Sequence, residues 1–67
     1  MISEIKMEQI VVALIDHFDI KKKIGYRATI MKSYDLYKDK NMEDLLTELI
    51  MITAQYKKEE MDECTIQ

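Results

Sequence analysis

The sequence predicts a small all-α protein with three helices in antiparallel, hairpin-like packing. It contains no proline and a single glycine, so few residues interrupt a helix. Its apolar residues recur at three- and four-residue spacings, the period of an amphipathic helix. At 67 residues the chain forms one domain, 1–67. Because a chain of this size buries only about 60% of its unfolded surface, we expect dimerisation or a partner to complete the unit.

The first helix is predicted over about 4–24. Ser3 is a suitable N-cap, and Ile2 is placed to contact Met7 across it. Val12 is the odd apolar residue on the polar face of this helix. The opposite, apolar face is wide, and its members are Met7, Ile10, Val11, Leu14, Ile15 and Phe18.

The end of the first helix has two possible positions. Gly25 suits the left-handed residue that follows a helix, and the three lysines of 21–23 would complement the helix dipole there. In the alternative, the helix ends at Phe18, Asp19 caps the next helix, and Gly25 lies inside that helix. A glycine within a helix costs about 1 kcal/mol relative to alanine. We therefore favour an end before Gly25.

The second helix is predicted over about 26–39. Leu36 stands apart from its apolar stripe, with Ala28 at one edge. The members of the stripe recur at helical spacing, and they are Tyr26, Ile30, Met31, Tyr34 and Tyr37.

The third helix is predicted over about 42–62, with Asn41 as its N-cap and Asp44 at the third position. Met51 lies on its polar face. Residues 62–67 have lost the apolar pattern, so we expect a frayed tail. The seam of this helix follows the 3-4-3-4 spacing of a helical hairpin, through Met42, Leu45, Leu49, Ile52 and Tyr56.

Charge is segregated along the chain. Residues 21–40 hold seven basic and two acidic residues, a balance of +5, whereas 1–20 and 41–67 carry −3 and −5. A basic second helix between two acidic ones is the pattern of electrostatic matching, either within one chain or between two copies.

The sequence gives no support for an enzyme, a metal site or a cofactor. His17 has no partner that the sequence places beside it, and one histidine with one cysteine cannot supply four zinc ligands. Cys64 has acidic neighbours, which disfavour the reactive thiolate. We therefore expect a non-enzymatic protein without catalytic, cofactor-binding or metal-binding residues.

The sequence also favours a cytoplasmic protein that does not enter the membrane. The longest uncharged apolar run, 9–15, is far shorter than a membrane span, and no signal peptide is evident. A single thiol fits a reducing compartment. Nine lysines against one arginine are typical of an A+T-rich genome, which suggests a bacterial or phage source.

We expect a protein-interaction module, a regulator or inhibitor that docks a helical surface on a larger protein and forms a homodimer. One alternative is a nucleic-acid-binding accessory protein that uses the basic second helix. Another is a structural subunit of a larger assembly. The predicted partner-binding residues are of two kinds. Some belong to the basic block, by which we mean 21–27, and three are apolar residues on otherwise polar faces. They are Lys21, Lys22, Lys23, Tyr26, Arg27, Val12, Leu36 and Met51.

Overall fold

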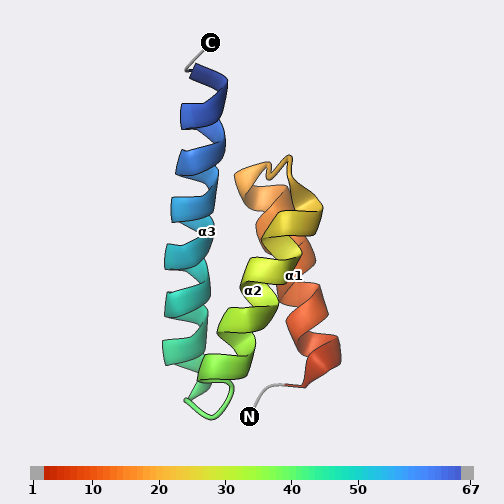
Figure 1. Ribbon diagram of the computed structural model, residues 1–67. Coiled ribbons are helices and arrows are strands. Elements are labelled where there is room, and N and C mark those ends of the chain that lie inside the picture. The colour runs from red at the N-terminus through yellow and green to blue at the C-terminus, as the bar shows by residue number, and fades with distance from the viewer. Residues whose placement is uncertain (1–2, 66–67) are drawn as a thin grey trace.

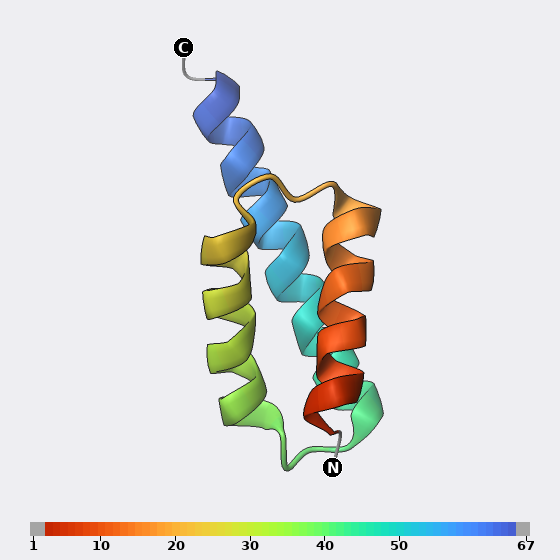
Figure 2. The same cartoon turned by 90° about the vertical axis from the view of Figure 1, so that its right-hand side faces the viewer.

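The computed structural model describes residues 3–65, and their side chains as far as residue 62. It contains three helices, α1 (Glu4–Phe18), α2 (Lys23–Tyr37) and α3 (Met42–Thr65). The helices run in alternating directions, so that each is antiparallel to the next along the chain (Figures 1 and 2). No strand occurs within 3–65. The prediction of an all-α unit of three helices is therefore confirmed.

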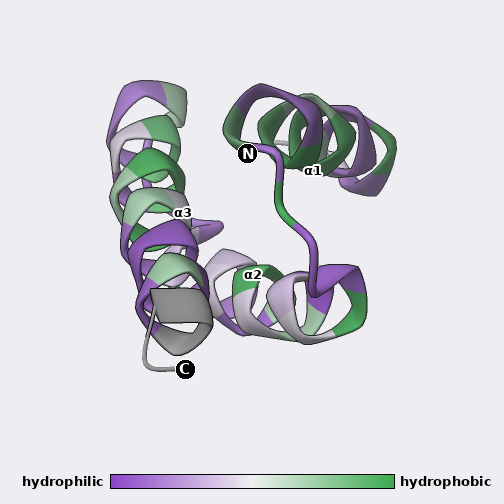
Figure 3. Cartoon of the chain, turned by 90° about the horizontal axis from the view of Figure 1, so that it is seen from above, coloured by the Kyte–Doolittle hydropathy of each residue, from purple (hydrophilic) through white to green (hydrophobic). Residues whose placement is uncertain are grey.

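The core lies between the three helices, which stand at the corners of a triangle when viewed from above (Figure 3). Each helix contributes fully buried apolar side chains four residues apart, and partly buried ones fill the three-residue spacings between them. The joint between α1 and α2 adds one more through Ile20. The buried apolar residues are Met7, Val11, Ile15, Ile20, Tyr26, Ile30, Tyr34, Leu45 and Leu49.

Two helix starts are capped as the sequence indicates. The Ser3 hydroxyl accepts a hydrogen bond from the backbone N–H of Lys6 at 3.1 Å. The Asn41 side-chain oxygen accepts one from the N–H of Asp44 at 2.8 Å. Both bonds satisfy amide groups that have no partner within their own helix. The predicted contact of Ile2 with Met7 falls outside the described residues.

The preferred end of the first helix was wrong, because α1 ends at Phe18 and not before Gly25. Asp19 follows in the left-handed conformation, with φ 54° and ψ 52°. The N–H of Ile20 bonds to the carbonyl of Ile15 at 3.0 Å, and that of Asp19 to Asp16 at 3.3 Å. This pair of bonds is a Schellman motif, and the buried side chain of Ile20 anchors it in the core. Asp19 therefore caps the end of α1 rather than the start of α2.

The third helix continues further than predicted, to Thr65 in place of residue 62. The expected frayed tail of 62–67 is thus helical as far as 65, and 66–67 lie outside the described residues, as does the side chain of Cys64. The apolar pattern does stop near Lys57, but polar contacts replace it. Glu60 and Lys57 both bond to the α1–α2 joint, which holds this part of α3 against the rest of the protein.

Candidate protein-interaction groove

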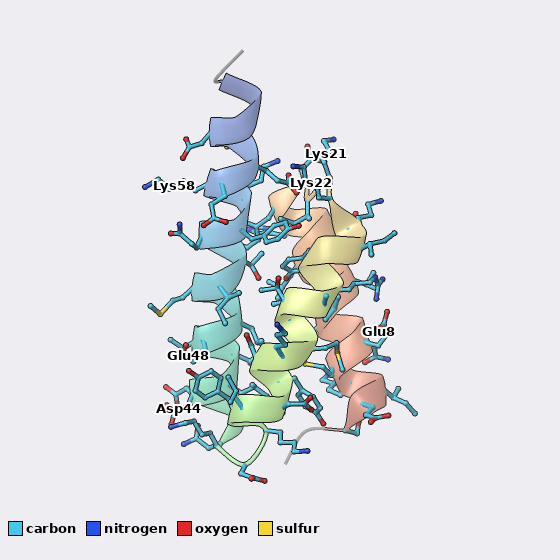
Figure 4. The ribbon with its side chains drawn as sticks, in the orientation of Figure 1. Glu8, Lys21, Lys22, Asp44, Glu48 and Lys58 are labelled. Carbon is cyan, nitrogen blue, oxygen red and sulfur yellow. The ribbon has the colours of Figure 1, made fainter. Side chains whose placement is uncertain are left out.

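The predicted partner-binding residues fall in several places. The three lysines of 21–23 occupy the joint and the first residue of α2, and they border one shallow hollow with Ile24 and Gly25. Figure 4 shows Lys21 and Lys22 at the joint. Met51, 61% exposed, lies on α3, and Leu36, 75% exposed, lies near the end of α2. Val12 lies on α1 and borders neither the hollow nor the groove described below.

Tyr26 was wrongly assigned to the contact surface, because its side chain is fully buried at 0% exposure. Its hydroxyl lies 2.7 Å from the Thr53 hydroxyl, which itself donates to the carbonyl of Leu49 at 2.6 Å. Burial raises the pKa of Tyr26, and the bond to Thr53 partly opposes that rise. This tyrosine therefore ties α2 to α3 within the core.

A groove runs between α2 and α3, and we call it the α2–α3 groove. Met51, Ile52 and the Tyr56 ring give it apolar character. Tyr56 and Glu59 also border the neighbouring hollow beside Lys22, so the groove continues to the basic joint. The lining residues are Thr29, Glu48, Met51, Ile52, Gln55, Tyr56 and Glu59.

This surface carries charges of both signs. Glu48 and Glu59 line the α3 side, and the lysines of 21–23 surround the joint. Figure 4 shows Lys21 and Lys22 at the joint, beside the upper part of α3. Glu48 lies lower on α3, nearer the start of that helix. Such a surface can orient a charged partner while the apolar residues supply contact area.

Glu60 holds the joint in place. Its carboxylate is only 6% exposed, and it accepts hydrogen bonds from the backbone N–H groups of Lys21 and Lys22 at 2.9–3.1 Å. Burial raises the pKa of Glu60, but the two N–H groups and the nearby Lys57 ammonium outweigh this and lower the pKa overall. A side chain from α3 thus caps the start of α2, where Lys22 offers no capping side chain of its own.

Part of the basic block is paired with acids of the same chain. Arg27 on α2 pairs with Glu8 on α1, and Lys21 pairs with Asp19 at 3.0 Å. The Lys21 hydrogen bond and charge lower the pKa of Asp19. The Lys57 ammonium donates to the Asp19 carbonyl at 2.8 Å and lies 3.6 Å from Glu60. These contacts reduce the charge that the block presents to an outside ligand.

Sequence reasoning missed Glu60 as the residue that organises the joint, and it missed the groove. The signal for the groove was present, because Met51, Gln55 and Glu59 recur at four-residue spacing beside the apolar stripe. No sequence signal distinguished Glu60 from the other acids of α3, since its role depends on the distant joint.

Among the described residues no three His, Cys, Asp or Glu side chains cluster to hold a metal ion. Within the same part of the chain, every helix is too short or too polar to cross a membrane. Comparison with protein families, curated proteins and solved structures gives no match.

Proposed function

We propose that this chain is a small, non-enzymatic protein-interaction module that binds a helical segment of a protein in the α2–α3 groove. The observation that carries the proposal is the groove itself, an apolar strip with exposed Met51, two acids on its α3 side and the lysines of the joint beside one end. Amphipathic helices bind in grooves of this kind through apolar anchors spaced along one face.

The residues of the groove suit this role. Met51 is long and flexible, so it can adapt to the shape of a partner side chain. The Tyr56 ring offers a large apolar surface at low entropic cost, and tyrosine is a frequent anchor of binding energy. Glu48 and Glu59 favour a partner helix that presents lysine or arginine beside its apolar face.

A nucleic-acid partner is less well supported. Arg27 and Lys21 are paired with acids of this chain, and Glu59 and Glu60 lie beside Lys22. Phosphate binding depends on basic charge that is available to release counterions.

The lone thiol fits a cytoplasmic location, which we include in the proposal.

Affinity capture from the native host tests the proposal. The wild-type chain is compared with Met51→Glu, which places a third acid in the groove, and with Ile5→Glu, a matched change on exposed α1 surface. Far-UV circular dichroism establishes that both variants remain helical. We expect the wild type and Ile5→Glu to retain the same protein and Met51→Glu to lose it.

A protein retained equally by all three baits would contradict docking in the groove. Tight binding of a DNA or RNA duplex that weakens steeply with salt, and is lost when Lys21, Lys22 and Lys23 become alanine, would favour the nucleic-acid alternative.

A further inference from the structure

We propose that a second copy of this chain occupies the α2–α3 groove, giving a two-fold dimer in which α2 of each copy packs against α3 of the other. The inference rests on the proposed function, because it names the partner of the same groove. It is carried by the charges of the two sides of the groove and by the register of the two helices.

The two sides of the groove differ in charge. Glu48 and Glu59 line the α3 side, and Asp44 precedes Glu48 by one turn on the same side of α3 (Figure 4). On α2, Lys32 follows the groove residue Thr29 by three positions, so it lies on the same face. The α3 side is therefore acidic from Asp44 to Glu48, with Lys58 further along the same side (Figure 4). The α2 side carries Lys32, with Asp35 one turn later.

The register of α2 against α3 follows from two contacts. The Tyr26 hydroxyl meets that of Thr53, and the Tyr56 hydroxyl packs against Gly25. Because the two helices are antiparallel, moving forward in sequence along α2 corresponds to moving backward in sequence along α3. Lys32 therefore lies level with Glu48, and Lys22 lies level with Glu59, which it meets at the hollow beside the groove.

Two symmetric arrangements can bring the groove faces of two copies together. A two-fold axis across the helices would place α3 against α3, with acid facing acid. An axis parallel to the helices places α2 against α3 of the second copy and keeps each residue at its own height. Lys32 then faces Glu48 of the second copy, and the contact forms twice because the interface is isologous.

This arrangement also covers apolar side chains. Leu36 lies on α2 seven residues after Thr29, hence on the groove face, and Met51 lies on α3. A stable interface buries about 800 Å² per partner, roughly one sixth of the 4961 Å² that the chain exposes. Burying one face of two helices brings the dimer near that size. Neither Lys32 nor Glu48 makes an ion pair elsewhere in the described part of the chain.

Charge reversal tests the contact. Molecular mass is measured by sedimentation velocity and light scattering from about 5 to 200 µM for the wild type, Lys32→Glu and Glu48→Lys. We expect a wild-type dimer and at least a tenfold weaker association of each variant alone, because like charges then face each other twice. An equimolar mixture of the two variants restores opposite charges at both contacts, so we expect it to form a heterodimer.

Matched reversals on α1, Lys6→Glu and Asp16→Lys, serve as controls and leave the dimer unchanged. A wild-type chain that is monomeric at 200 µM overturns the inference. So does a dimer that the groove reversals leave unchanged, or a mixture that stays monomeric. A monomeric chain that still loses its captured protein on Met51→Glu overturns the dimer but keeps the proposed function. A rescued dimer whose capture does not depend on Met51 supports the dimer and counts against a second protein in the groove.

Discussion

The Tyr56 hydroxyl lies 2.7 Å from the position that a β-carbon on Gly25 would occupy. It donates a hydrogen bond to the carbonyl of Lys22 at 3.0 Å, and its ring meets Tyr26 edge-on at 5.5 Å between centroids. Gly25 lies in α2 and has no positive φ. The chain therefore requires glycine here for its small size and not for its backbone freedom.

We predict that Gly25→Ala destabilises the protein by about 1 kcal/mol, although alanine is the better helix former. The methyl group displaces the Tyr56 hydroxyl, and overpacking of this kind costs about 1–3 kcal/mol. The gain in helix propensity offsets about 1 kcal/mol of that cost. Urea unfolding followed by circular dichroism gives the change in the free energy of unfolding.

In a Tyr56→Phe background, Gly25→Ala should have the opposite effect on the free energy of unfolding. Without the hydroxyl, the nearest atom of the ring lies 3.9 Å from the new methyl group, an ordinary contact. Gly25→Ala then raises the free energy of unfolding by about 0.5–1 kcal/mol through propensity alone. Ala28→Gly, at an exposed position of α2, calibrates the propensity term. Destabilisation of equal size in both backgrounds would contradict the steric role of Tyr56.

The fold class and the starts of α1 and α3 could be predicted because they depend on local pattern. The bounds of the second helix were less accurate, since α2 spans Lys23–Tyr37 in place of the predicted 26–39. Ser3 and Asn41 stand directly before apolar periodicity, and the core residues of α1 and α3 repeat at helical spacing. Such signals need no knowledge of distant segments.

The joint and the groove depend on contacts between distant segments. Gly25 can end a helix or make room for a ring, and only the position of Tyr56 decides between these roles. Glu60 resembles a solvated acid in sequence, yet it caps a helix that begins almost forty residues earlier. Tyr26 belongs to the apolar stripe of the second helix and also adjoins a basic block, so the sequence favours both burial and exposure. Its burial follows from packing against Thr53.

We predict that Glu60→Gln destabilises the protein at neutral pH by about 1–3 kcal/mol. The change removes the charge that accepts the N–H groups of Lys21 and Lys22, and a buried charged acceptor is worth about that much. Glu59→Gln, on the neighbouring exposed residue, is the matched control and should change the free energy of unfolding by less than about 0.5 kcal/mol.

The effect of Glu60→Gln should depend on pH in a defined direction. The folded protein lowers the pKa of Glu60, so the stabilisation is present above the unfolded pKa of about 4.3 and is lost as the pH falls through the folded-state pKa. The difference between wild type and variant, measured by urea unfolding from pH 7 to pH 2.5, should therefore shrink below about pH 4. A stability difference that stays constant down to pH 2.5 would show that it does not arise from the charge of the Glu60 carboxylate.

Asp19→Gly should stabilise the joint. Asp19 has a left-handed backbone that glycine adopts without strain, and its ion pair with Lys21 is exposed and contributes little. We expect the melting temperature to rise by about 4 °C. Asp19→Ala is the control. It removes the same carboxylate, but alanine tolerates the left-handed backbone less well than aspartate does, so the melting temperature should fall. A fall with glycine as well would show that the carboxylate matters more than the backbone.

The buried pair of Tyr26 and Thr53 should respond unequally to loss of either hydroxyl. Thr53 donates to the Leu49 carbonyl, so it accepts the proton of Tyr26. Tyr26→Phe leaves the Thr53 donor satisfied and should cost about 1 kcal/mol, whereas Thr53→Val leaves the buried Tyr26 hydroxyl without its partner and should cost about 2–3 kcal/mol.

The double variant of this pair, Tyr26→Phe with Thr53→Val, should lose less free energy of unfolding than the sum of the two single changes, because it leaves no buried hydroxyl unpaired. Urea unfolding of all four proteins completes the cycle. Additive losses would mean that the two hydroxyls contribute independently. A larger loss for Tyr26→Phe than for Thr53→Val would mean that the donor assignment is reversed.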